Sequence, residues 1–145
     1  MTNSDPISAV PEVVPVVDYF VPDETSPHLL AWVCDGCGAS YLERRNGCGR
    51  CSGTLFSRRT VPGSGTVKTY TVVWRNAPSV ATPFVSCVVD LGDGLTVKSN
   101  LVDIDPAAVD TRVLGQPVVL VDSDLGTDAA GTVARTFAFR LVNGA

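Results

Sequence analysis

The stretch CDGCGASYLERRNGCGRC, residues 34–51, holds two Cys-x-x-Cys pairs separated by ten residues. This spacing is typical of a four-thiolate zinc ribbon, in which each pair sits on a tight turn and the two turns together complete a tetrahedron. Soft thiolates fill all four positions, so we expect a structural zinc site with no place for a reactive water. Iron in a rubredoxin-like site is the chief alternative. The predicted metal ligands are Cys34, Cys37, Cys48 and Cys51.

Two redox motifs, or four unrelated thiols, are the other interpretation of these cysteines. A redox Cys-x-x-Cys is expected at the start of a helix in a βαβ unit, whereas glycines surround both pairs here, at Gly38, Gly47, Gly49 and Gly53. The fifth cysteine, Cys87, stands in a valine-rich segment. We interpret it as a small buried hydrophobe and not as a nucleophile, because a lone histidine is a poor partner for it.

The sequence on either side of the cysteines divides the chain into three parts. Residues 1–25 contain four prolines and are predicted to form an extended arm, since proline at that density disfavours both helix and interior strand. Residues 26–62 are predicted to hold a short helix, begun by Ser26 and Pro27, and the ribbon. The turn cluster PGSG at residues 62–65 marks the boundary with a domain over residues 63–145.

The last part has the β-branched content and turn spacing of an all-β domain. Its second and third strands are joined by a Gly-Asp-Gly hairpin signal, and Asp105 and Pro106 predict one short helix between the third and fourth. The fold class is therefore mainly β: an N-terminal rubredoxin-like zinc ribbon, then a five-stranded barrel of the oligonucleotide/oligosaccharide-binding (OB) type, with a split sandwich as the alternative. The predicted strands are residues 66–74, 84–90, 95–102, 118–122 and 132–142.

Charge is segregated along the chain. The net charge of −4 is made of −5 over residues 1–33, +3 over residues 34–62, −6 over residues 88–130 and +2 in each remaining part. An acidic chain of this kind is a poor general binder of polyanions. No apolar run approaches the roughly 18 residues that span a bilayer, and the start MTNSDPISAVPEVV lacks the pattern of a secretory signal. We expect a soluble cytoplasmic protein with reduced thiols.

Two groups of side chains are candidates for binding. Arg44, Arg45 and Arg50 belong to an arginine cluster on a very small module; they form either a solvated face or a grip for phosphates or for an acidic partner surface. In the first strand of the barrel, Lys68 and Tyr70 share a face by the two-residue period and are expected to flank a groove on the outside of the barrel. An ordinary half-exposed strand is the alternative.

These pieces in combination resemble one known family, the proteins with domain of unknown function 35, a rubredoxin-like zinc ribbon joined to an OB fold. The resemblance runs from about Pro27 to Val121. Besides the cysteine pairs it rests on PGSGTV at residues 62–67, YTVV at 70–73, PFV at 83–85, DG at 93–94 and NLVD at 100–103.

The resemblance implies an accessory subunit that is not an enzyme on its own. Such proteins assemble with thiolase-superfamily enzymes (thiolases, acyltransferases, or sterol-carrier-type retro-aldolases of lipid, steroid or aromatic-acid degradation) and help to enclose acyl-CoA, a ligand shared by the complex. A MaoC-type enoyl-CoA hydratase is the alternative partner. The family implies a hetero-oligomer with structural Zn²⁺ and no catalytic residue in this chain. The candidate CoA- or partner-binding residues are Arg44, Arg45, Arg50, Lys68, Tyr70, Trp74 and Phe84.

Two other classes of function are weighed against this one. Ribbons and OB folds also bind single-stranded nucleic acid through basic grooves and stacking aromatics, but the acidic residues 88–130 weigh against that. An independent metalloenzyme is the weakest alternative, because a closed four-cysteine site has no open position and one histidine offers little acid–base chemistry.

Overall fold

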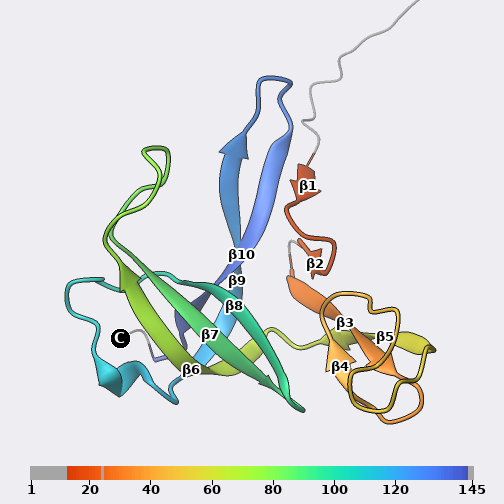
Figure 1. The fold of residues 1–145 in the computed structure, drawn as a ribbon. Coiled ribbons are helices and arrows are strands. Elements are labelled where there is room, and N and C mark those ends of the chain that lie inside the picture. Colours follow the sequence, from red (N-terminus) through yellow and green to blue (C-terminus); the bar gives the residue numbers. More distant parts are fainter. Residues whose placement is uncertain (1–12, 24, 144–145) are drawn as a thin grey trace, which may run out of the picture.

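A computed structural model describes residues 13–23 and 25–143 as two β-sheets and one short 3-10 helix (Figure 1). One sheet forms a barrel, and the other carries the cysteine stretch. The elements in chain order are β1 Val13–Pro15, β2 Phe20–Val21, β3 His28–Cys34, β4 Ser40–Tyr41, β5 Phe56–Val61, β6 Ser64–Val73, β7 Phe84–Gly92, β8 Leu95–Leu101, η1 Thr111–Val113, β9 Pro117–Thr127 and β10 Val133–Leu141.

The predicted five-stranded OB-fold barrel is confirmed. Its strands follow the order β8-β7-β6-β9, and β10 pairs with β9 in antiparallel and with β8 in parallel, which closes the sheet on itself. The parallel join is narrow, because its one Cα pair is Phe139 with Leu101. Closure removes the open edges that a split sandwich would have.

Alternation along the barrel strands fills the interior with side chains. Phe139 is fully buried, Phe137 nearly so, and their rings lie edge to face at 6.1 Å. Cys87 is 2% exposed, as expected for a small buried hydrophobe. Gly65 of β6 lies directly against the backbone of β7, since a Cβ there would lie 2.5 Å from the carbonyl oxygen of Asp90. No other residue type fits that position without displacing backbone.

The helix expected between the third and fourth barrel strands is smaller than predicted and starts later. Asp105 does cap a turn, because its carboxylate accepts from the amide of Ala107 and its carbonyl from that of Ala108. The chain then leaves this turn, and the 3-10 helix Thr111–Val113 begins after a second cap, Asp110, whose carboxylate accepts from the amide of Arg112. Val113 is the residue that this turn buries.

The short helix expected after Ser26 is wrong: His28–Cys34 is strand β3. Leu29 and Ala31 alternate into the core, and β5 pairs with β3 from Leu29 to Cys34. β2 and β4 pair with the two ends of β3. The Ser-Pro helix-start signal contributes little stability compared with the hydrogen bonds that β3 forms with three strands. The tertiary context therefore overrides the local preference for helix.

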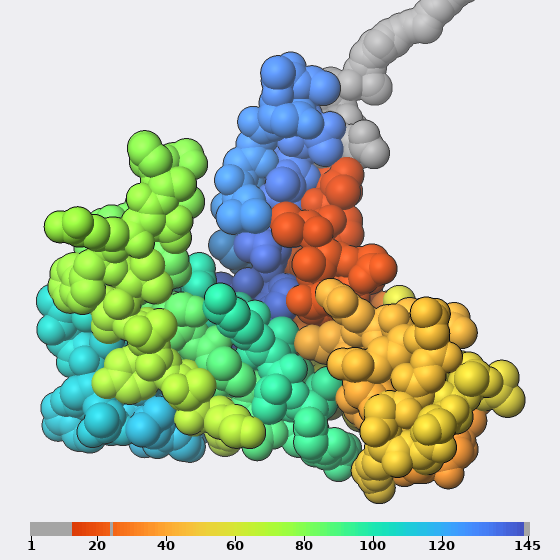
Figure 2. Space-filling view, viewed as in Figure 1, coloured from red at the N-terminus to blue at the C-terminus, as the bar shows by residue number. Residues whose placement is uncertain are grey.

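Two projections rise from the same side of the barrel (Figures 1 and 2). One is the loop between β6 and β7. The other is the hairpin of β9 and β10, in which β9 runs further than predicted, to Thr127, and Arg135 joins Asp122 at 2.6 Å and Asp124 at 3.8 Å across the two strands. β1 lies along this hairpin, paired in parallel from Val13↔Val133 to Pro15↔Arg135.

The ribbon sheet and the barrel share one hydrophobic core. Phe20, Leu29 and Val61 belong to the same buried cluster as Phe137 and Leu120. The rings of Phe20 and Phe137 lie 5.4 Å apart, and the amide of Leu120 donates to the carbonyl of Gly63. The boundary between residues 62 and 63 stays a prediction, as does the extended arm, of which residues 1–12 lie outside the described part.

Candidate metal centre and the adjoining groove

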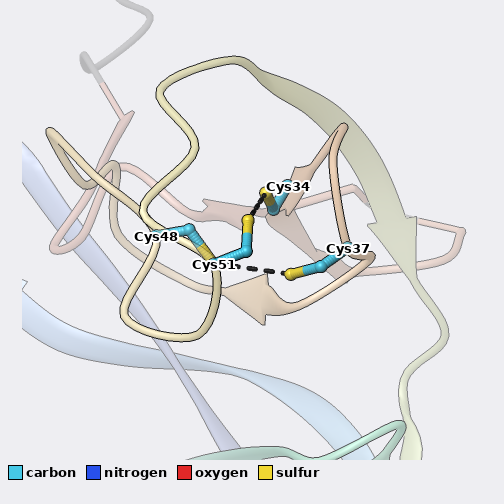
Figure 3. A group of neighbouring side chains, drawn as sticks. All are labelled: Cys34, Cys37, Cys48 and Cys51. Atoms are coloured by element: carbon cyan, nitrogen blue, oxygen red, sulfur yellow. Dashed lines mark hydrogen bonds between the residues drawn. The ribbon is translucent and has the colours of Figure 1, made fainter.

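The four predicted ligand cysteines converge on one point (Figure 3). Cys34 ends β3, Cys37 lies on the turn that follows, and Cys48 and Cys51 lie on a second turn between β4 and β5. The side chains of both turns point toward one another, and all four sulfurs lie within 4.8 Å of each other. Two turns far apart in the sequence are therefore brought face to face by the pairing of β3 with β4 and β5.

The sulfur geometry fits a tetrahedral metal ion. The Sγ atoms of Cys34 and Cys51 lie 3.5 Å apart, and those of Cys37 and Cys48 3.6 Å. A tetrahedron with metal–sulfur bonds of about 2.3 Å requires sulfurs about 3.8 Å apart. Four thiolates at this separation are a donor set for zinc or a similar thiophilic ion.

The two turns have the same backbone design. In each, the amide four residues after the first cysteine donates to that cysteine's carbonyl: Gly38 to Cys34 at 2.9 Å, and Ser52 to Cys48 at 2.8 Å. Both of these donors have positive φ, +81° and +66°. Gly53, next to the second turn, has little room for a side chain, because a Cβ there would lie 3.2 and 3.3 Å from two of the sulfurs.

Polar groups outside the four ligands act on Cys48. The Tyr41 hydroxyl lies 3.5 Å from its Sγ, and the amide of Arg50 donates to it at 3.4 Å. These hydrogen bonds lower the pKa of the Cys48 thiol to about 6, with the Tyr41 contact the largest cause. The same contact raises the pKa of Tyr41. The amide of Gly49 donates to the Tyr41 oxygen at 3.1 Å and so orients the ring.

Cys51 behaves in the opposite way. The amide of Gly53 lowers its pKa, but hydrogen bonds shared with the sulfurs of Cys34 and Cys37 outweigh that effect and raise the pKa to about 12. Neighbouring sulfurs that each carry charge repel, so one proton is held within the group. A divalent ion would replace that proton and relieve the repulsion.

A groove runs between the ribbon and the barrel beside the metal centre. It has a volume of about 690 Å³ and is lined on one side by residues 40–45 and on the other by residues 94–98. Arg44 and Arg45 lie on its ribbon side, together with Glu43, and Lys98 lies on its barrel side. Two of the predicted binding arginines are thus brought together with a lysine from β8.

The remaining predicted binding residues are spread over the surface. Arg50 is exposed on the second cysteine turn, and Lys68 is exposed at a bulge where the pairing of β6 with β7 shifts register. That bulge breaks the two-residue period, so Tyr70 packs against the barrel core and does not share an outer groove with Lys68. Trp74 is 60% exposed just after β6, and Phe84 is half-buried at the start of β7.

Lys98 is a groove residue that the sequence interpretation missed. The signal available in the sequence was a basic residue, in a predicted strand, among the eight acids of residues 88–130. Its place opposite Arg44 and Arg45 depends on how the ribbon packs on the barrel. Nothing local in the sequence encodes that packing.

Within the described ranges, no helix is long and apolar enough to cross a membrane. No curated protein matches the chain in sequence.

Two comparisons with known proteins agree with this architecture. Residues 58–121 match the family model described as "ChsH2, C-terminal OB-fold domain". A chain of the solved structure described as "Ltp2-ChsH2(DUF35) aldolase" is similar with 26% sequence identity and a TM-score of 0.62; the match covers 79% of this chain and 84% of that one. Residues 58–121 are therefore similar to the ChsH2 C-terminal OB-fold domain, and the resemblance of the chain to the proteins with domain of unknown function 35 is confirmed.

Proposed function

We propose that this chain is a non-catalytic accessory subunit of a thiolase-like aldolase that acts on acyl-CoA. The observation that carries the proposal is the likeness to a chain of the Ltp2-ChsH2 aldolase, because it extends over 79% of this chain and therefore reaches beyond the barrel. The catalytic groups would come from the partner, since the four cysteines that converge in this chain form a closed site.

In this proposal the four cysteines bind structural Zn²⁺. Their sulfurs are spaced for a tetrahedral ion, and the Tyr41 hydroxyl and the Arg50 amide stabilise thiolate at Cys48. When bound, the ion supplies folding free energy to the ribbon and no chemistry. Its second role is indirect, because it holds the segment that carries Arg44 and Arg45 against the barrel.

The groove is where this subunit would meet the CoA part of the substrate. Arg45 and Lys98 approach it from opposite walls, and CoA carries a diphosphate and a ribose phosphate that such cations bind. Glu43 on the ribbon wall reduces the positive charge, so the groove is expected to help binding and not to supply most of it. The acyl group would lie in the partner.

Co-expression with a thiolase-like aldolase subunit from the same organism tests the assembly. We expect a stable hetero-oligomer by size exclusion with light scattering, and aldol cleavage of acyl-CoA that requires both chains. Equal activity without this chain, together with no complex, would refute the proposal.

The groove is tested separately in that complex. Lys98→Ala and Arg45→Ala should each raise KM for acyl-CoA about five- to tenfold, which corresponds to the loss of one charge-assisted contact, with little change in kcat. Arg140→Ala, which removes an exposed arginine outside the groove, is the matched control and should leave KM unchanged. A KM that responds equally to all three changes would exclude the groove as the CoA site.

A further inference from the structure

A second cationic surface lies on the ribbon, on the face of its sheet that points away from the core. Leu29 and Ala31 of β3 are fully buried toward the barrel, so the alternating Trp32 points to the opposite face. Arg58 of β5 pairs directly with Trp32 and stands on that same outer face. Neither residue lines the groove between ribbon and barrel. We call Trp32, Arg44 and Arg58 the outer ribbon face; Arg44 also lines the groove, so the two surfaces meet at this residue.

Aromatic rings hold the arginines of this face in fixed positions. The guanidinium carbon of Arg58 lies 4.2 Å from the centre of the Trp32 ring, and that of Arg44 lies 5.2 Å from the same ring and 5.8 Å from that of Phe56. Stacking on an aromatic face is favourable for a guanidinium and restricts its rotamers, while its N–H edges stay free to donate. Arg58 and Arg44 are both exposed.

The guanidinium groups of Arg44 and Arg58 form no ion pair with any residue that the structure describes. Among the described residues, the arginines with a carboxylate oxygen within 4.0 Å are Arg112 and Arg135. Arg58 and Arg44 instead share one ring, which brings two like charges close together. The cost of that repulsion is relieved when an anion binds both. Arg112 and Arg135 of the barrel form internal ion pairs, whereas Arg44 and Arg58 of the ribbon are presented to solvent.

We propose that the outer ribbon face docks on an acidic surface of the catalytic subunit; this rests on the proposed function. Carboxylates on a protein surface match the geometry, because a guanidinium stacked through its plane still offers a two-pronged edge. An arginine–tryptophan pair at an exposed site is also the composition of interface hot spots. A nucleic acid fits less well, since the net charge of −4 would oppose a long polyanion.

The test measures the affinity between the full-length chain and the thiolase-like subunit identified in the co-expression experiment. Arg58→Glu should weaken Kd about tenfold or more, since it replaces attraction by repulsion at an interface centre. The wild-type Kd should also weaken between 50 and 300 mM salt, and Arg58→Glu should flatten that dependence. Arg140→Glu makes the same charge change on the barrel and is the matched control; its Kd should stay within twofold of wild type.

Trp32 variants separate a binding role from a folding role. Trp32→Ala should weaken Kd about three- to tenfold, whereas Trp32→Phe keeps a ring under the guanidinium groups and should restore most of the affinity. All variants should keep one metal ion per chain.

Several results would overturn the proposal. A wild-type Kd for Arg58→Glu would leave the accessory function standing but remove this face from the interface. An equal loss with Arg140→Glu would show unspecific charge effects. Binding of millimolar tripolyphosphate to the free chain that is lost in Arg58→Glu, together with a partner Kd that does not respond to salt, would make the face a phosphate site. Absence of any wild-type complex would refute both this inference and the proposed function.

Discussion

The ribbon and the barrel differ in which residue types they bury and in how they use their arginines. In the ribbon, the segment from Cys34 to Cys51 buries two cysteines as its hydrophobic residues, while the barrel buries a continuous set of valines, leucines and phenylalanines. Arg44, Arg45 and Arg58 of the ribbon lie over aromatic rings, whereas the barrel pairs Arg135 with two aspartates. A short, polar segment can thus keep a rigid cationic surface only if something other than apolar burial folds it.

The comparison predicts that removing one thiolate destroys the ribbon. Metal binding in small ribbons supplies about 10–16 kcal/mol of apparent free energy, and that energy is the folding energy of the module. Cys34→Ala should lose the metal, measured by elemental analysis, and lose the dispersed amide resonances of residues 34–56. Cys87→Ala, which removes a buried thiol from the barrel, is the control and should keep one ion per chain. Full metal content in Cys34→Ala would contradict the ligand assignment.

Truncation of the barrel core should have the converse result. Phe139 is fully buried, so Phe139→Ala should lower the free energy of unfolding by about 3–5 kcal/mol, measured in urea. The thiolates are held by their own turns, so metal content should stay at one ion per chain. Simultaneous loss of the metal would show that the shared core around Phe20 makes the two regions a single cooperative unit.

The close crossing of β6 and β7 gives a smaller effect. Gly65→Ala would place a Cβ 2.5 Å from the Asp90 carbonyl, and we expect a loss of about 1–3 kcal/mol in the free energy of unfolding. Gly47→Ala in the ribbon is the matched control, because no atom lies within 4 Å of its added Cβ. Equal free energies of unfolding for the two variants in urea would mean that β6 and β7 move apart to admit the Cβ without loss of stability.

The least effect is expected from pH acting on Cys87. Burial raises the pKa of its thiol to about 11 from an ordinary value of 9.0, so alkylation by iodoacetamide at pH 8 should be about 100-fold slower than for an exposed thiol. Above pH 9 the thiol ionises in the unfolded chain but stays neutral in the folded one, so this group's contribution to stability declines as pH rises from 9 to 11. Rapid modification of the native protein at pH 8 would contradict this.

The sequence predicted what depends on spacing and alternation. Cysteine spacing identified the four residues whose sulfurs converge, and β-branched content with turn signals identified the five barrel strands. The prediction failed where long-range pairing decides. His28–Cys34 carried a helix-start signal, yet three strands pair with it, and the bulge at Lys68 turned Tyr70 toward the core.

The groove and the outer ribbon face show the same limit. Arg44 and Arg45 were candidates by composition, but their neighbours Lys98 and Trp32 come from other strands. The positions of those neighbours follow from the packing of the ribbon on the barrel and from the register of β3 with β5. Neither this packing nor this register is encoded by a local pattern of residues in the sequence.

The pairing of β1 with β10 sets an order for folding during synthesis. Val13 emerges from the ribosome early but pairs with Val133, and β10 is also the strand that closes the barrel against β8 and β9. The ribbon, whose pairing partners lie within residues 20–61, is complete long before that. A nascent chain can therefore hold metal and expose its cationic face while the barrel is still open, and barrel closure is among the last steps.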